Sequence, residues 1–238
     1  MVVNLTQRYL VGELMDDPNL AEREHHQALH GLRRVNQLSR TANVMAKAII
    51  QHCKSEKLAF VRVLDLACGG GDVTEQVAKR LKQAGVSAEV HGWDRSQTAI
   101  DFARRQGARG SQPHVHFDVA DALIDVSDRS FDIVYCTLFL HHLSDAEANR
   151  LLGVMWRLAS GLVLIDDLRR STIGYALAVV GCQLLSRSPI VHVDGPLSVR
   201  AAFTESEIRE LSDRCDLPCP TIQRHWPHRF LLTWAVSS

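Results

Sequence analysis

Short apolar runs alternate with amphipathic stretches along the middle of the 238-residue chain, from about residue 60 to residue 165. Compact runs rich in β-branched residues are typical of buried strands in a parallel sheet, whereas apolar residues three or four positions apart are typical of helices packed against it. Their regular alternation predicts an α/β domain with right-handed crossover connections. The predicted strands are Phe60–Leu66, Ala88–Trp93, His114–Val119, Phe131–Leu138 and Gly161–Ile165.

The pattern changes after the fifth predicted strand. Residues 168–203 contain an apolar helix and then a segment with Pro189 and Pro196, which we expect to be a loop in an insertion over the carboxyl edge of the sheet. Two further strands, Thr221–Trp226 and Phe230–Val236, close the chain with only three residues between them. Because so short a connection joins antiparallel strands, we expect a largely parallel seven-stranded sheet with an antiparallel C-terminal hairpin.

The beginning of the chain is helical and more polar than the rest. Leu20–Gln27 and Ala28–Arg40 are charged and amphipathic, and Asn43–His52 has its apolar residues on one helical stripe. We expect residues 1–55 to form an N-terminal helical cap over a main domain that spans residues 56–238.

A glycine-rich turn follows the first predicted strand. Gly69, Gly70 and Gly71 separate that strand from a helical pattern that begins at Thr74. Strand, glycine turn and helix make up the first unit of nucleotide-binding α/β folds, in which glycines let the backbone pass close to a ligand. Asp65 lies ahead of the glycines, near the carboxyl end of the strand. Its carboxylate would repel a phosphate but suits a ligand with a positively charged group, such as an amino acid ammonium.

The pattern Asp65-x-Ala67-x-Gly69-x-Gly71 resembles the first motif of the class I S-adenosylmethionine (SAM) methyltransferases of the small-molecule type, apart from Ala67, where many members have glycine. The resemblance implies a Rossmann-like methyltransferase fold with SAM as cofactor and S-adenosylhomocysteine (SAH) as its product. It assigns Asp65, Ala67, Cys68, Gly69 and Gly71 to the cofactor site.

Polar residues also follow the other predicted strands. Asp94 comes after the second strand, roughly 20 residues beyond the glycine turn, where a carboxylate accepts hydrogen bonds from ribose hydroxyls. This spacing suits NAD as well as SAM, and the alternative is that Asp94 caps the following helix. The resemblance further implies cofactor contacts from Asp121 and Ala122 at the adenine, and from Thr137 and Leu138 along the methionine part; for Asp121 the alternative is a simple turn aspartate.

Trp93 and Arg95 flank the ribose position as candidates to lie against the adenine, and the alternative for Trp93 is a packed core residue. Arg40 lies on a polar helix face, from which it either reaches the SAM carboxylate or the substrate or is simply solvated.

Two adjacent histidines, His141 and His142, follow the fourth predicted strand. The resemblance places them opposite the transferred methyl group, where a neutral imidazole accepts a proton from a phenol or another hydroxyl. The alternative is a histidine that binds backbone at the strand end. We interpret both histidines as candidate catalytic residues.

Asp166 and Asp167 follow the fifth predicted strand and raise the question of a metal centre. The catechol-type O-methyltransferases resemble a different pattern, with an acid also at the end of the fourth strand, where this chain has Thr137. We therefore predict no metal, and interpret the two aspartates as a polar pocket edge or as ion-pair partners of Arg169 and Arg170.

Composition narrows the choice of partners. Lys and Arg together number 27, as do Asp and Glu, so the formal net charge of zero argues against a nucleic-acid partner. Six cysteines without a CxxC pair are typical of reduced thiols in a cytoplasmic protein. A signal-peptide pattern is lacking, and the longest apolar run, Ile173–Leu185, is shorter than the about 20 residues of a membrane helix, so we expect no stable membrane insertion. Monomer and homodimer both stay open.

The combined pattern predicts methyl transfer from SAM to oxygen or carbon of a small aromatic or lipophilic molecule of the phenol, quinone or polyketide kind. An apolar stripe in the insertion, Tyr175, Leu177, Val180 and Leu184, is expected to line the substrate pocket. Two other classes stay open: a non-catalytic SAM-binding regulatory protein, and an NAD(P)-dependent oxidoreductase, against which Asp65 argues.

Overall fold

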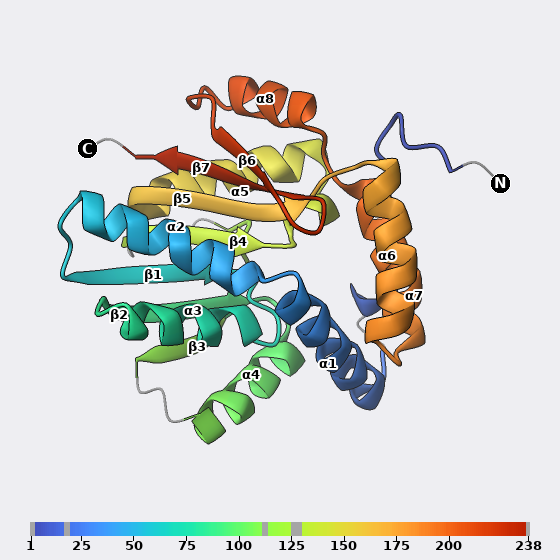
Figure 1. Ribbon diagram of the computed structural model, residues 1–238, viewed down its shortest axis with the longest axis horizontal. Helices are drawn as coiled ribbons and strands as arrows, with labels where there is room; N and C mark the ends of the chain where they lie inside the picture. The colour runs from blue at the N-terminus through green and yellow to red at the C-terminus, as the bar shows by residue number, and fades with distance from the viewer. Residues whose placement is uncertain (1–2, 17–19, 111–113, 125–129, 237–238) are drawn as a thin grey trace.

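The computed structural model describes residues 3–16, 20–110, 114–124 and 130–236, and its core is a seven-stranded sheet in the order β3-β2-β1-β4-β5-β7-β6 (Figure 1). Strands β1 to β5 run parallel, and β7 pairs antiparallel with both β5 and β6. The Rossmann-like sheet with its antiparallel C-terminal hairpin is thereby confirmed. The strands are β1 (Phe60–Leu66), β2 (Ser87–Asp94), β3 (Val115–Val119), β4 (Phe131–Thr137), β5 (Ala159–Leu168), β6 (Thr221–His225) and β7 (Arg229–Ala235).

Helices cover both faces of the sheet. Side chains alternate along β1, so that Val61 and Val63 pack with α2 and α3 on one face, whereas Leu64 and Leu66 pack with α5 and α8 on the other. The helices are α1 (Glu22–Leu38), α2 (Thr41–Ser55), α3 (Asp72–Gln83), α4 (Gln97–Gly110), α5 (Asp145–Leu158), α6 (Thr172–Leu185), α7 (Pro189–Ala201) and α8 (Glu205–Arg214), with short 3-10 helices η1 (Leu14–Asp16) and η2 (Leu140–His142).

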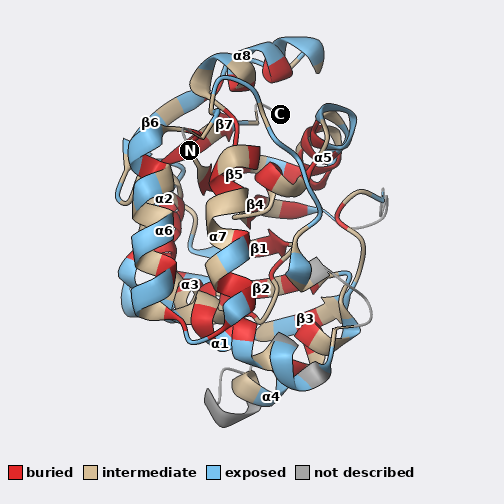
Figure 2. Ribbon diagram, turned by 90° about the vertical axis from the view of Figure 1, so that its right-hand side faces the viewer, coloured by how far each residue is buried: buried red, intermediate tan, exposed pale blue. Residues whose placement is uncertain are grey.

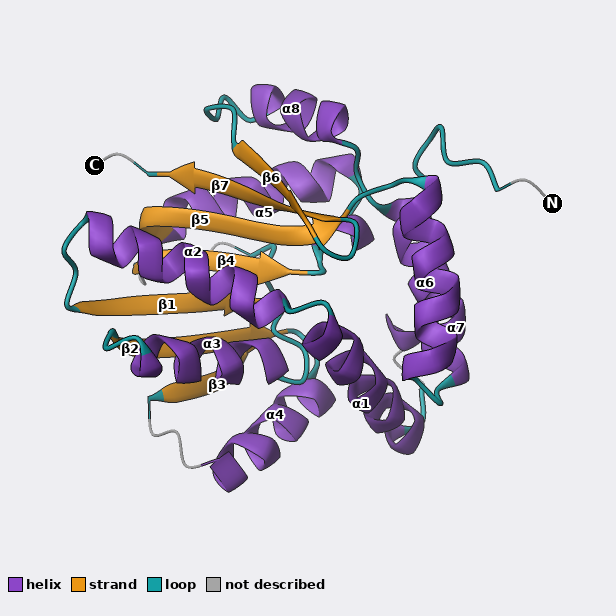
Figure 3. Cartoon of the chain, viewed as in Figure 1, coloured by secondary structure: helices purple, strands orange, loops and turns teal. Residues whose placement is uncertain are grey.

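The central strands are the most deeply buried part of the molecule, and the outer helix surfaces are exposed (Figure 2). Strand order reverses between β1 and β4, which are neighbours at the centre of the sheet. In open α/β sheets ligands bind outside the carboxyl ends of the strands at such a switch point. Helices α1, α6 and α7 stand beyond these strand ends, so they cover the edge at which a ligand is expected (Figure 3).

Two expectations about local structure are wrong. Residues 20–40, predicted as two helices, contain the single helix α1, and the segment with Pro189 and Pro196, expected as a loop, forms helix α7. Pro189 occupies the first turn of α7, where its missing N–H costs nothing. Burial of Ile190 and Val191 among the neighbouring helices offsets the cost of Pro196 inside the helix.

Residues 3–16, which we name the N-terminal strap, run past the end of α7 and the η2 turn. The Arg8 guanidinium joins these two elements, because it donates to the backbone carbonyl of Ala201 at 2.7 Å and to that of Leu143 at 2.7 Å. The strap ends in η1, which packs against α7. A segment outside the sheet is thus held against the carboxyl edge.

The two helices within the first 55 residues pack against different parts of the protein. Helix α2 packs into the core through Met45 and Ile49, whereas α1 contacts α6 and α7 as well as α2. The division at residue 55 stays a prediction. All six cysteines are free thiols. Within the described ranges, the helices are too short or too polar to cross a membrane.

Candidate active site

The turn after β1 is built on left-handed backbone. Ala67, Gly69 and Gly71 have positive φ angles of 56°, 53° and 75°. A Cβ on Gly71 would clash with Phe117 at 2.6 Å, and Cys68 is buried against the same ring. A Cβ on Gly69, in contrast, would meet no atom within 4 Å. Gly69 therefore faces open space at the carboxyl edge of the sheet.

Asp94, the last residue of β2, lies directly beside this turn. Its Oδ2 atom accepts a hydrogen bond from the Gly69 N–H at 2.8 Å, and its Oδ1 atom accepts one from the Ser96 N–H at 2.8 Å. The half-buried carboxylate fixes the turn and the start of α4 at once. It also lies next to the open face of Gly69.

Asp65 lies beneath the turn, with its side chain fully buried. Its Oδ2 atom accepts a hydrogen bond from the Thr74 hydroxyl at 2.6 Å. Burial raises the pKa of Asp65 to about 8, although hydrogen bonding by Thr74 and Tyr135 opposes the shift. A cation bound nearby would favour the ionised carboxylate.

The residues predicted at the adenine and ribose lie in different surroundings. Asp121 accepts a hydrogen bond at 2.8 Å from the backbone N–H two residues further on, in the turn after β3. Ala122 is buried in the core beside Trp93, whose ring stands at 84° to that of Phe131. Arg95 is exposed after β2. Asp121 and Arg95 are therefore at the strand ends, whereas Trp93 is a core residue.

Thr137 and Leu138 flank the switch point. Thr137 ends β4, and the Leu138 N–H donates to the carbonyl of Asp166 at 2.8 Å. Arg40 is exposed at the start of α2, where it lines a narrow groove with Asp72 at the first turn of α3. Arg40 therefore lies near the end of α3 that carries the glycine turn.

His141 forms a short, buried pair with Asp167. Its Nδ1 atom lies 2.6 Å from Oδ1 of Asp167, and its backbone N–H donates to Oδ2 at 3.0 Å. Burial alone would raise the pKa of Asp167, but the His141 imidazole and the hydrogen bonds to the carboxylate hold that pKa below its usual value. Because an ionised carboxylate only accepts, Nδ1 of His141 is the donor in this pair, and in a neutral imidazole the acceptor is then Nε2.

Glu13 of the N-terminal strap approaches the same imidazole from its other side. One Glu13 oxygen lies 3.7 Å from Nε2 of His141, and the other lies 3.8 Å from Nε2 of His142. The Ser198 hydroxyl of α7 donates to Oε1 of Glu13 at 2.5 Å. Sequence reasoning did not identify Glu13, because no periodicity or motif links the strap to the η2 turn. The only feature of the sequence that pointed to Asp167 was its position after the fifth predicted strand.

The expectation that Asp166 and Asp167 pair with the neighbouring arginines is wrong. Asp166 lies 3.0 Å from Nε2 of His225 on β6, whereas Arg169 and Arg170 bind glutamates of α8. Strand β5 continues through both aspartates, so their side chains point to opposite faces of the sheet. Asp166 therefore contacts His225 on one face of the sheet, whereas Asp167 contacts His141 on the other.

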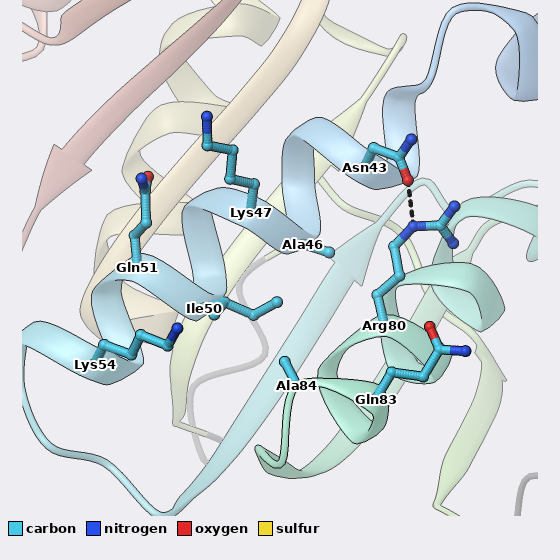
Figure 4. Close-up of a pocket in the computed structure, with 9 residues that line it drawn as sticks. All are labelled: Asn43, Ala46, Lys47, Ile50, Gln51, Lys54, Arg80, Gln83 and Ala84. Carbon is cyan, nitrogen blue, oxygen red and sulfur yellow. Dashed lines mark hydrogen bonds between the residues drawn. The ribbon is translucent and has the colours of Figure 1, made fainter.

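A groove between α2 and α3 lies at the other end of α3 from the glycine turn (Figure 4). Asn43 and Arg80 face each other across it, and Lys47 and Lys54 add positive charge. It shares Asn43 and Arg80 with the narrow groove of Arg40, and its other lining residues continue towards the C-terminal ends of α2 and α3.

These features define a class of protein. Three features agree with the methyltransferase resemblance that the Asp65–Gly71 motif suggested. They are a parallel sheet closed by an antiparallel hairpin, a glycine turn between β1 and α3, and a carboxylate at the end of β2. Residues 63–160 match the family model described as a methyltransferase domain. Residues 63–160 are thus similar to a methyltransferase domain, and the chain has the fold of solved SAM-dependent methyltransferases.

Individual relatives are distant. The chain is 33% identical over 135 residues to the ubiquinone biosynthesis O-methyltransferase of Azoarcus sp., a match that covers 56% of this chain and 54% of the relative. It spans about half the length of the curated relatives of this kind.

Solved structures share the fold at low identity. The DszA carbon methyltransferase aligns with a TM-score of 0.61 at 15% identity, over 82% of this chain and 53% of that one. The magnesium protoporphyrin IX methyltransferase of Synechocystis with bound SAH aligns with a TM-score of 0.58 at 17% identity, over 85% and 87%. At these identities the similarity shows the fold.

Proposed function

We propose that the protein binds SAM and transfers its methyl group to an oxygen atom of a small aromatic or lipophilic molecule. The buried pair of His141 and Asp167 is the observation that carries this proposal. It lies where β4 and β5 end, and β4 is the neighbour of the strand that leads into the glycine turn. Cofactor motif and candidate base thus share one edge of the sheet.

The residues around the turn fit SAM. Gly69 leaves space for a ligand, and the Asp94 carboxylate beside it is able to accept ribose hydroxyls. Asp65, when ionised, would favour the ammonium group from beneath the turn. Asp121 would accept from the adenine amino group, with Arg95 at the ribose. SAM, when bound, supplies a strongly electrophilic methyl group on a sulfonium centre.

His141 is the group proposed to remove the proton of the acceptor. Asp167 fixes the tautomer in which Nε2 is the acceptor, and its negative charge stabilises the imidazolium that forms. His141 is only 3% exposed, which limits competition from water. Thr137 and Leu138 would position the methionine part of the cofactor, with Arg40 a further candidate for its carboxylate.

Oxygen is favoured because a base is most useful where the accepting atom begins with a proton, as in a phenol. The name of the Azoarcus relative, an O-methyltransferase, supports this choice. Of the predicted apolar stripe on α6, Tyr175 and Leu177 are half-buried, but Val180 and Leu184 are 57% and 79% exposed. We therefore propose that only Tyr175 and Leu177 border the acceptor.

The acceptor is proposed to be a free small molecule in the cytoplasm rather than a nucleic acid. The six free thiols and the zero net charge support these two points.

Calorimetry with SAM and SAH tests the cofactor, and we expect affinities in about the micromolar range. Radiolabelled SAM offered with phenols, quinones and polyketides then tests the transfer. His141→Ala should bind SAH as the wild type does and lose transfer. Binding of NAD without SAM would overturn the proposal. SAM binding without transfer to any acceptor, in wild type and variant alike, would favour the regulatory alternative.

A further inference from the structure

We propose that Glu13, His141 and His142 form a binding site for a divalent transition-metal ion of the Zn²⁺ class. The three side chains come from the N-terminal strap and from the η2 turn. One ligand atom from each lies within 4.8 Å of the other two. Two imidazole nitrogens and a carboxylate oxygen are the donor set that Zn²⁺ and its neighbours in the periodic table prefer, whereas Mg²⁺ and Ca²⁺ prefer oxygen donors.

The spacing of the donor atoms argues for an ion between them. The Glu13 oxygens lie 3.7 Å from Nε2 of His141 and 3.8 Å from Nε2 of His142. Both distances are too long for hydrogen bonds. A tetrahedral zinc ion with bonds of about 2.0–2.2 Å holds its donor atoms roughly 3.4 Å apart. Glu13 is therefore set close to the separation from each histidine that a shared ion requires.

Two of the three side chains, His141 and Glu13, have an outer support. Nδ1 of His141 binds Asp167 at 2.6 Å, and a metal-bound histidine typically makes this contact to a carboxylate through its other nitrogen. Oε1 of Glu13 accepts from the Ser198 hydroxyl. The Asp194 carboxylate accepts the backbone N–H of Leu14, the residue after Glu13, at 3.0 Å. His141 and Glu13 are thus oriented without an ion.

The charges of the cluster also favour a cation. Asp167 is fully buried and Glu13 is only 12% exposed at its side chain, and both carboxylates face His141. Two carboxylates on one imidazole leave a local negative charge that a divalent ion would neutralise. The sequence predicted no metal because the end of β4 lacks an acid. Here the acid comes instead from the strap.

The consequence for turnover rests on the proposed function. An ion on Nε2 of His141 takes the lone pair that the proposed base needs, so Zn²⁺ and the acceptor proton compete. We therefore expect Zn²⁺ to inhibit methyl transfer.

Titration of the chelator-treated full chain with ZnCl₂ tests the site by calorimetry, without any need for turnover. We expect one ion per chain, and at least tenfold weaker binding by Glu13→Gln and by His142→Ala. With Co²⁺ in place of Zn²⁺, visible absorption bands should report a site with nitrogen and oxygen donors, and Glu13→Gln should change them. Unchanged thermal melting of each variant would exclude unfolding as the cause.

Glu89→Gln is the matched control, because Glu89 also lies beside two imidazoles, with its Oε1 atom 3.1 Å from His91 and 3.8 Å from His116. It should bind Zn²⁺ as the wild type does. A wild type that binds no Zn²⁺, or a loss of binding in Glu89→Gln rather than Glu13→Gln, would overturn the proposed metal site. Zn²⁺ that binds at Glu13 but activates transfer would support the site and contradict the base role of His141.

Discussion

Oδ1 of Asp167 lies 2.6 Å from Nδ1 of His141, although the two residues are 26 positions apart in the chain. His141 follows β4 and Asp167 lies near the end of β5, and these two parallel strands are neighbours in the sheet. The short η2 turn folds the imidazole back over the end of β5. The sheet therefore fixes which ring nitrogen faces Asp167 and the direction of the candidate base. This relationship makes Asp167 a positioning residue rather than a group that touches substrate.

Asp167→Asn should lower kcat by about 10- to 100-fold while KM and SAH affinity change little, because the amide no longer fixes the Nδ1 proton or stabilises an imidazolium. The pH profile of kcat should shift as well, which a purely structural role would not cause. Asp166→Asn, which removes the adjacent buried carboxylate but no contact to His141, is the control. Equal losses in both variants would contradict the assigned role.

Asp94→Ala should abolish SAH binding measured by calorimetry and leave the sheet folded. The variant loses the proposed ribose acceptor and also the bond that holds the Gly69 N–H at 2.8 Å. Asp118→Ala changes a half-exposed carboxylate on the neighbouring strand and should bind SAH normally. Retained binding by Asp94→Ala would move the ribose site elsewhere.

Asp65 should make stability depend on pH. Its pKa is raised to about 8 in the folded protein, so between about pH 4 and pH 8 the folded state holds a proton that the unfolded state has lost. Stability is therefore lost as pH rises through this range, by up to about 1.4 kcal/mol per pH unit from this group. Urea unfolding of the cofactor-free wild type and of Asp65→Asn should show this slope only in the wild type.

The same carboxyl should link SAM affinity to pH. If the ammonium binds ionised Asp65, association should strengthen as pH rises towards about 8, by up to tenfold per unit. Asp65→Asn should bind SAM weakly at every pH. An equal pH dependence in wild type and variant would remove Asp65 from the cofactor site.

Ala67→Gly should raise the free energy of unfolding by about 1 kcal/mol, because Ala67 has a φ of 56° and only glycine adopts this conformation without strain. Denaturant unfolding measures the change. Ala99→Gly, at a buried helical position, should instead lower stability by a similar amount. A destabilised Ala67→Gly would show that the alanine methyl contributes more by packing than it costs in strain.

The strands were predictable because a strand buried on both faces appears in the sequence as a compact run of apolar residues. The predicted Phe60–Leu66 is the observed β1, and the hairpin was found with small shifts of its ends. Helix α7 was missed because proline is a local signal, whereas the burial of Ile190 and Val191 that holds the helix depends on tertiary contacts.

Within the site, too, features with a local sequence signal were predicted, and features that depend on tertiary contacts were not. The glycine turn and Asp94 belong to one βαβ unit with a defined spacing, so sequence could locate them. Glu13 reaches His141 because tertiary contacts hold the strap in place, among them the Ser198 hydroxyl of α7 and the Asp194 carboxylate. A contact between the start of the chain and a turn near its middle has no counterpart in periodicity or spacing. Detecting it required the folded chain.

The strap has a practical consequence for anyone who prepares this protein. Residues 3–16 contribute no strand to the seven-stranded sheet and no part of the glycine turn, so we expect a version that lacks the strap to retain both. Such a sample should show the expected circular dichroism and bind SAH. It would nevertheless lack Glu13 and the Arg8 contact that holds the end of α7 to the η2 turn. The choice of expression boundary and of the tagged terminus therefore decides which of the protein's properties an assay is able to detect.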